Sequence, residues 1–171
     1  PFQRWFPYIE GYSINFVKKV IDQYCSDADL IYEPFAGTGT TIFAADNEEK
    51  QVCYSEVNPL LRFLIDVKIK VLSLEGKIRR ALSSKLIELS LNLSDMVESQ
   101  DESTELASSY EKCFGKSEYF QNENKNAIMK MRSLIDKFAE EGDVLFADLL
   151  KIATCSILIP VSYLKRQGDI R

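Results

Sequence analysis

Two glycines and two acids in the first third of the chain have the types and spacing of a site for a nucleotide cofactor. Gly37 and Gly39 lie in the segment EPFAGTGTT (33–41), between a predicted strand and a predicted helix. Glycine lets the backbone turn sharply and approach a ligand closely, and the helix that follows offers unpaired N–H groups at its start. Glu56 ends the next predicted strand, where an acid can accept the hydroxyls of a ribose. On spacing alone, the two glycines could equally close a structural turn.

Short strands and helices alternate around these residues. Residues 30–33 and 51–56 contain β-favouring side chains and predict two short strands. Three helices are expected. The first covers about 14–25 with Ser13 as its N-cap, and a short second helix begins at residue 41. The third covers 58–76, with Pro59 in a tolerated first-turn position. The order therefore predicts an α/β segment over 1–75, with the site at the carboxyl ends of its strands.

After residue 75 the pattern becomes helical. Residues 76–97 carry leucines at helical spacing that predict core positions, among them Leu86, Leu89 and Leu93. Helices are expected at about 124–140 and 143–158, and the acidic stretch 98–124 is interpreted as a loop or a short-helix connection. Residues 76–171 therefore form a predicted helical module with an acidic connection and a basic tail. That tail carries Lys165, Arg166 and Arg171, which either contact phosphate or are simply solvated.

Composition narrows the possible chemistry. The 171 residues are 46% hydrophobic with a net charge of −5, values typical of a globular chain. The absence of histidine excludes an imidazole base or metal ligand within this sequence. Four widely spaced cysteines favour neither a zinc site nor a redox pair, so we expect no metal and free, mostly buried thiols in the cytoplasm. The apolar runs are shorter than the roughly 18 residues of a membrane span.

Two features of the loop argue against a dinucleotide. Ile42 occupies the place of the third glycine in the dinucleotide fingerprint, and Glu33 would repel a pyrophosphate. A cofactor with a cationic methionine end and no phosphate suits this position better.

The same segment resembles a known family. Residues 33–41 are similar to the D/E-P-F-x-G-x-G-T-T loop of DNA amino-methyltransferases that use S-adenosylmethionine. Glu56-Val57-Asn58-Pro59 resembles the ribose-binding element of that family, and RWFPYIEGYS (4–13) resembles the motif that precedes its loop. The resemblance covers roughly residues 2–70. It implies a partial Rossmann-like core of the class I methyltransferase type, carrying a large helical module.

The resemblance also implies roles for individual residues. Phe35 and the two glycines would line the cofactor cradle, Glu56 would bind the ribose, and Asn58 with Pro59 would border the adenine. Tyr8 and Tyr12 would lie on the methionine side, although aromatic residues at such positions more often only pack. The whole implied cofactor-binding set is Tyr8, Tyr12, Ser13, Glu33, Phe35, Gly37, Gly39, Thr40, Thr41, Glu56, Val57, Asn58 and Pro59.

The catalytic motif of that family is missing. The family acts through [D/N/S]-P-P-[Y/F/W], whereas the five prolines of this chain include no Pro-Pro pair, and no Pro-Cys is present. The sequence also begins without Met and stops abruptly, so we expect a piece of a larger enzyme that binds cofactor but is inactive alone. The catalytic motif would lie in a downstream segment or on a second chain, and DNA would bind the complete enzyme.

The leading hypothesis is therefore the cofactor-binding portion of a restriction–modification DNA methyltransferase that modifies an exocyclic amine of adenine or cytosine. One alternative is a non-catalytic S-adenosylmethionine-binding subunit of a split enzyme. Another is a fragment of an RNA methyltransferase, because that group shares a similar loop. The helical module could be an insertion, a target-recognition element or a dimer face.

Overall fold

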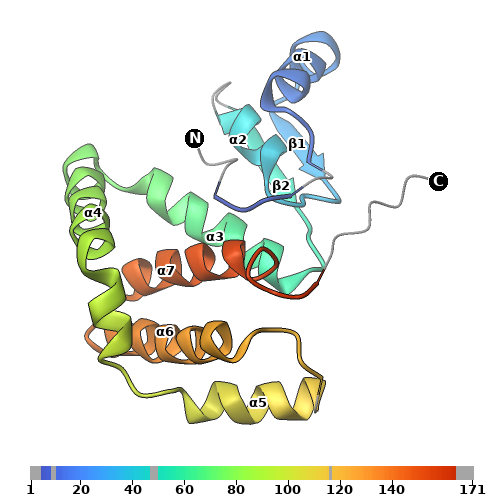
Figure 1. Cartoon of the computed structure of the whole chain (residues 1–171). Helices are drawn as coiled ribbons and strands as arrows, with labels where there is room; N and C mark the ends of the chain where they lie inside the picture. Colours follow the sequence, from blue (N-terminus) through green and yellow to red (C-terminus); the bar gives the residue numbers. More distant parts are fainter. Residues whose placement is uncertain (1–4, 9–10, 47–49, 116, 165–171) are drawn as a thin grey trace. The chain divides into compact units, whose positions relative to one another are not determined.

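A computed structural model describes residues 5–8, 11–46, 50–115 and 117–164 (Figure 1). The basic tail with Lys165, Arg166 and Arg171 lies outside the described residues. The chain divides into two compact units between Ser73 and Leu74, and each unit is described here by itself. Within the described ranges, no helix is both long and apolar enough to cross a membrane.

The first unit contains three helices and two strands: α1 (Ile14–Tyr24), β1 (Leu30–Glu33), α2 (Thr40–Asp46), β2 (Gln51–Tyr54) and α3 (Pro59–Ser73). The two strands pair in parallel, from Leu30 opposite Gln51 to Glu33 opposite Tyr54. Helix α2 connects them, as a parallel pair requires. Strand β2 ends two residues earlier than the sequence predicts, because Ser55 turns to bond the loop that follows β1.

One face of this small sheet is covered by α1 and α2. Val17 and Ile21 of α1 pack with Ala44 and Ala45 of α2, and Ile31 and Val52 of the strands pack against this cluster. The alternate strand positions, Leu30, Tyr32, Gln51 and Cys53, are exposed. The described residues are therefore mostly helical with a two-stranded parallel sheet, which is consistent with an α/β fold and is smaller than a Rossmann-like core.

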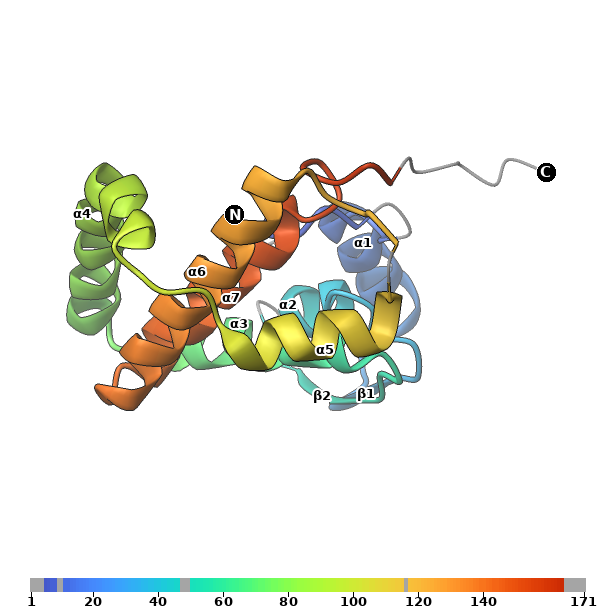
Figure 2. The same ribbon diagram turned by 60° about the horizontal axis from the view of Figure 1, so that its bottom comes forward.

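The second unit is helical. It consists of α4 (Gly76–Glu98), α5 (Thr104–Phe114), α6 (Asn122–Glu140) and α7 (Val144–Ile157). Helices α6 and α7 run side by side (Figure 2), joined by a tight turn at Gly142, whose φ is +91°. The stretch interpreted as a loop or short-helix connection thus contains α5, which Ser103 caps by accepting a hydrogen bond from the Leu106 N–H at 3.3 Å.

The core of this unit joins α4, α6 and α7. Leu89 is buried with Ile135 and Phe146, while Leu86 and Leu93 pack against the same cluster. The predicted core positions of these three leucines are confirmed.

The expectation of mostly buried cysteines is wrong. All four cysteines are free, but Cys53 and Cys113 are exposed, and Cys25 and Cys155 are only partly buried. Cys53 is exposed because its strand position faces away from the two covering helices. Among the described residues, no group of three histidine, cysteine or acidic side chains could hold a metal ion.

Candidate functional site

The carboxyl ends of β1 and β2 are joined through Ser55. The Ser55 N–H donates to the Glu33 carbonyl at 3.0 Å, and the Ala36 N–H donates back to the Ser55 carbonyl at 3.1 Å. The Ser55 hydroxyl also donates to the Pro34 carbonyl at 2.8 Å. These bonds fix the segments that follow the two strands side by side, so the Gly-rich loop and Glu56 lie together.

Glu56 bonds directly to the Gly-rich loop. Its Oε2 accepts the Gly37 N–H at 2.7 Å, and its Oε1 accepts the Asn58 N–H at 2.8 Å. An ionised carboxylate has about four acceptor positions, so both oxygens retain capacity for further donors. Glu56 is therefore held in one orientation with acceptor sites left for a ligand hydroxyl.

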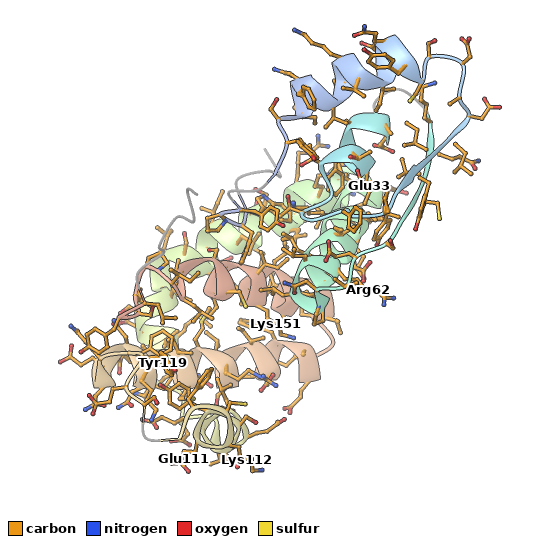
Figure 3. All side chains as sticks on the ribbon, turned by 90° about the vertical axis from the view of Figure 1, so that its right-hand side faces the viewer. Glu33, Arg62, Glu111, Lys112, Tyr119 and Lys151 are labelled. Carbon is orange, nitrogen blue, oxygen red and sulfur yellow. The ribbon has the colours of Figure 1, made fainter. Side chains whose placement is uncertain are left out.

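Glu33 connects the end of β1 to the start of α2. Its Oε1 accepts the Phe35 N–H at 3.0 Å, and its Oε2 accepts the Thr41 hydroxyl at 2.8 Å. Figure 3 shows this side chain at the loop. Glu33 thus stabilises the shape of the loop, a role that the sequence reasoning did not assign to it.

Both glycines of the loop have a positive φ. At Gly39 the φ is +87°, and a Cβ would come within 2.9 Å of the Phe43 ring and 3.1 Å of Ile65. At Gly37 the φ is +54°, and a Cβ would lie 3.3 Å from the Tyr8 ring. The turn itself therefore requires Gly39, whereas the contact with Tyr8 places an aromatic ring directly against the loop at Gly37.

Two further residues of the predicted aromatic opening, Tyr12 and Ser13, contact the first turn of α1. Ser13 caps α1, its hydroxyl accepting the Phe16 N–H at 3.2 Å. Tyr12 is 64% exposed, and its ring centroid is 5.8 Å from that of Phe16. The contacts of the described residues thus bring Tyr8 to the loop and give Ser13 a capping role.

Two large apolar side chains beside the acids are open to solvent. Phe35 is 85% exposed and Val57 is 97% exposed. Next to Val57, the Asn58 side-chain oxygen accepts the Leu60 N–H at 2.9 Å, and α3 begins at Pro59. Thr40, the first residue of α2, is buried. Phe35 and Val57 are therefore available for contact with a flat apolar ligand, whereas Thr40 is not.

Sequence reasoning missed Lys68, a buried lysine of α3. Its Nζ donates to the Thr38 carbonyl at 2.9 Å, and the side chain is only 2% exposed. Burial disfavours its charged form and lowers the pKa of Lys68 to about 8. The signal lay in helical spacing, because Lys68 occupies the stripe that also contains Leu61, Leu64 and Val71.

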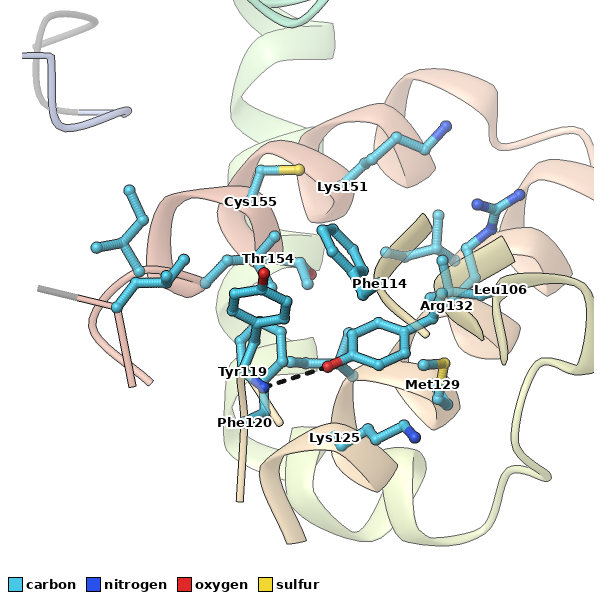
Figure 4. A pocket seen from close by; sticks show the side chains of 16 residues that line it. Leu106, Phe114, Tyr119, Phe120, Lys125, Met129, Arg132, Lys151, Thr154 and Cys155 are labelled. Atoms are coloured by element: carbon cyan, nitrogen blue, oxygen red, sulfur yellow. Dashed lines mark hydrogen bonds between the residues drawn. The ribbon is translucent and has the colours of Figure 1, made fainter. Parts of the chain in front are cut away.

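The helical unit has an apolar cavity of about 610 Å³ between α5, α6 and α7. Figure 4 shows Phe114, Tyr119 and Phe120 among its lining side chains, with Lys151 and Arg132 also in view. The Tyr119 N–H donates to the Tyr110 hydroxyl at 3.4 Å, which fixes the segment after α5. The sequence reasoning predicted no cavity in this unit.

Comparison with known proteins identifies relatives for nearly the whole chain. Type II methyltransferase M.AvaI of Nostoc sp. is 25% identical over 184 residues, an alignment that covers 99% of this chain and 33% of that protein. The protein of the same name from Anabaena variabilis matches with the same identity and coverage. No family model matches the chain, and no solved structure matches it.

The chain thus spans about a third of the length of these relatives. It is related to a type II methyltransferase, which confirms the methyltransferase resemblance given by the loop motifs. The similarity also extends through the helical unit, beyond the segment in which the motifs lie.

Proposed function

We propose that the first unit is the S-adenosylmethionine-binding segment of a site-specific DNA methyltransferase of a restriction–modification system. The observation that carries the proposal is the bond between Glu56 and Gly37, which joins the acid after β2 to the Gly-rich loop after the neighbouring strand β1. The relationship to M.AvaI supports the assignment to a methyltransferase. The two strands would then be part of a larger Rossmann-like sheet in the complete enzyme.

The residues at the loop fit the chemistry of this cofactor. Glu56 has acceptor capacity for the ribose hydroxyls beyond its two backbone bonds. The exposed Phe35 and Val57 would pack against the adenine, which Asn58 and Pro59 would border. Glu33 provides negative charge close to the loop, which favours the cationic methionine end over a phosphate.

The other proposed contacts lie around this centre. Tyr8 would pack against the methionine part, because its ring lies over Gly37. Tyr12, Ser13, Thr40 and Thr41 complete the proposed set, with the last two acting mainly through the backbone at the start of α2.

When bound, S-adenosylmethionine supplies a sulfonium methyl group for direct displacement by an exocyclic amine. The role of this chain in the reaction is to bind and orient the methyl donor, because a fixed donor geometry removes much of the entropic cost of the reaction. The target adenine or cytosine would be flipped out of the DNA to reach it. The motif that polarises the amine would come from a further segment or a second chain, so this chain alone would not turn over.

Calorimetric titration of S-adenosylmethionine tests the proposal in wild type and in Glu56→Gln. The amide keeps the shape of the side chain, but its NH₂ group would face either the Gly37 or the Asn58 N–H, donor against donor. We expect binding to weaken at least tenfold, as for the loss of one charge-assisted hydrogen bond.

The matched control is Glu75→Gln, which changes an exposed glutamate of the second unit, just before α4. It should bind the cofactor as wild type does. Equal binding by Glu56→Gln and wild type would remove Glu56 from the site. If folded wild-type protein binds no S-adenosylmethionine, the function proposed for this chain is refuted.

A further inference from the structure

Lys68 is a charged side chain in the interior of the first unit. Lysine is almost never fully buried unless it is paired, yet Lys68 is 2% exposed among Leu64, Ile65 and Val67 of the same helix. No carboxylate of the described residues forms an ion pair with it. Its contacts are the Thr38 carbonyl, 2.9 Å from Nζ, and the Phe43 ring, whose centroid is 5.4 Å from Nζ.

Burial of this ammonium works against folding. Desolvation lowers the pKa of Lys68 from 10.5 to about 8, so near neutral pH the side chain remains charged at a cost in stability. An apolar side chain of similar volume would fill the same space without that cost. The position therefore calls for an explanation beyond packing, and the only hydrogen bond that Lys68 makes within the described residues leads to the Gly-rich loop.

The bond acts on the central peptide unit of the loop. The carbonyl of Thr38 and the N–H of Gly39 belong to one rigid peptide group. Lys68 holds its carbonyl, and the Ala36 carbonyl accepts its N–H at 2.8 Å. This peptide is thus fixed at both ends, while Glu56 accepts the N–H of Gly37, two residues earlier in the loop.

We propose that Lys68 is a positioning residue of the cofactor cradle, whose buried ammonium holds the Thr38 carbonyl inward and so keeps the Gly-rich loop in the shape that receives S-adenosylmethionine. This inference rests on the proposed function for its ligand, but the hold on the loop is a property of the chain alone. Lys68 touches no cofactor in this arrangement; it acts through the peptide between Thr38 and Gly39.

The test compares wild type with Lys68→Met and, as control, Lys70→Met, which changes an exposed lysine of the same helix. The first measurement is hydrogen exchange at the Gly39 amide without cofactor. We expect Lys68→Met to exchange at least tenfold faster there, with no loss of stability in urea unfolding, because a charge-assisted bond is lost while a buried charge is removed. Lys70→Met should leave the exchange unchanged.

The second measurement is the affinity for S-adenosylmethionine, which should fall about tenfold in Lys68→Met and stay constant in Lys70→Met. Unchanged Gly39 exchange in a folded Lys68→Met would overturn the proposal, and so would unfolding of that variant, which would make Lys68 a determinant of stability. If wild type binds no cofactor but Gly39 still exchanges faster in Lys68→Met than in wild type, the proposed function is refuted. The role of Lys68 in fixing the loop is then still supported.

Discussion

The packing around Gly39 predicts how strongly the loop depends on this residue. In Gly39→Ala the new residue must adopt a φ of +87°, which costs about 1–2 kcal/mol for a side chain other than glycine. Its Cβ would also lie 2.9 Å from the Phe43 ring and 3.1 Å from Ile65. Both neighbours belong to the buried interior, so overpacking adds about 1–3 kcal/mol. We expect a total destabilisation of about 2–5 kcal/mol.

Gly142→Ala provides the matched control. Gly142 has a φ of +91°, and a Cβ there would meet no atom within 4 Å. It therefore carries the backbone cost without the packing cost, about 1–2 kcal/mol. Urea unfolding, followed by circular dichroism, gives the free energy for each variant against wild type. Equal destabilisation by the two substitutions would refute the claim that the Phe43 and Ile65 contacts require glycine at position 39.

Three further changes test other features of the described structure. Lys85→Met should destabilise the helical unit by about 1 kcal/mol in urea unfolding, because the Lys85 ammonium lies 4.5 Å from the Phe146 ring centroid and pairs with an exposed aspartate. Between pH 8 and pH 10.5, the free energy of unfolding of wild type should rise relative to that of Lys68→Met, by an amount on the order of 3 kcal/mol. In this pH range the lysine is deprotonated in the folded chain but still protonated in the unfolded chain. With a thiol reagent, Cys53 should react fast and Cys155 slowly, since burial raises the pKa of the Cys155 thiol.

Each of these outcomes has its own control. Lys77→Met, on the exposed part of α4, should leave the stability unchanged, and an equal loss in both lysine variants would contradict the aromatic contact. A flat difference between wild type and Lys68→Met across pH 8–10.5 would mean that Lys68 is not desolvated. Cys113→Ser should remove one fast thiol and leave that of Cys53; a slow Cys53 would contradict the exposed sheet face.

Local sequence signals predicted the elements of the site well. Strand and turn preferences, which act over a few residues, predict the strand at 30–33, the Gly-rich turn and the helix that follows it. The meeting of Glu56 with the loop followed from a general rule of parallel sheets, because the carboxyl ends of neighbouring strands share one edge. The sequence could not show that Glu56 and Glu33 each bind backbone N–H groups, since those bonds depend on the exact turn after each strand.

Other features could not be predicted from the sequence, because they depend on packing between residues that are distant along the chain. Lys68 lies at a core position of an amphipathic pattern, but sequence alone does not distinguish a buried lysine from a break in the stripe. The sequence does not distinguish helix α5 from a loop, because its segment is polar and none of its residues is buried. The exposure of Cys53 was missed because it depends on which sheet face the helices cover.

The exposed side of the sheet bears on the proposed function. Parallel sheets in α/β proteins are covered on both faces, whereas Leu30 and Tyr32 are 58% and 62% exposed on the face away from α1 and α2. Side chains of this size at strand positions are typical of sheet interiors. They are therefore suited to contact with further strands or helices, as the proposed larger sheet requires, and the chain spans about a third of the length of its relatives. The Gly-rich loop itself does not need that contact, because Glu33, Glu56 and Lys68 hold it from within the first unit.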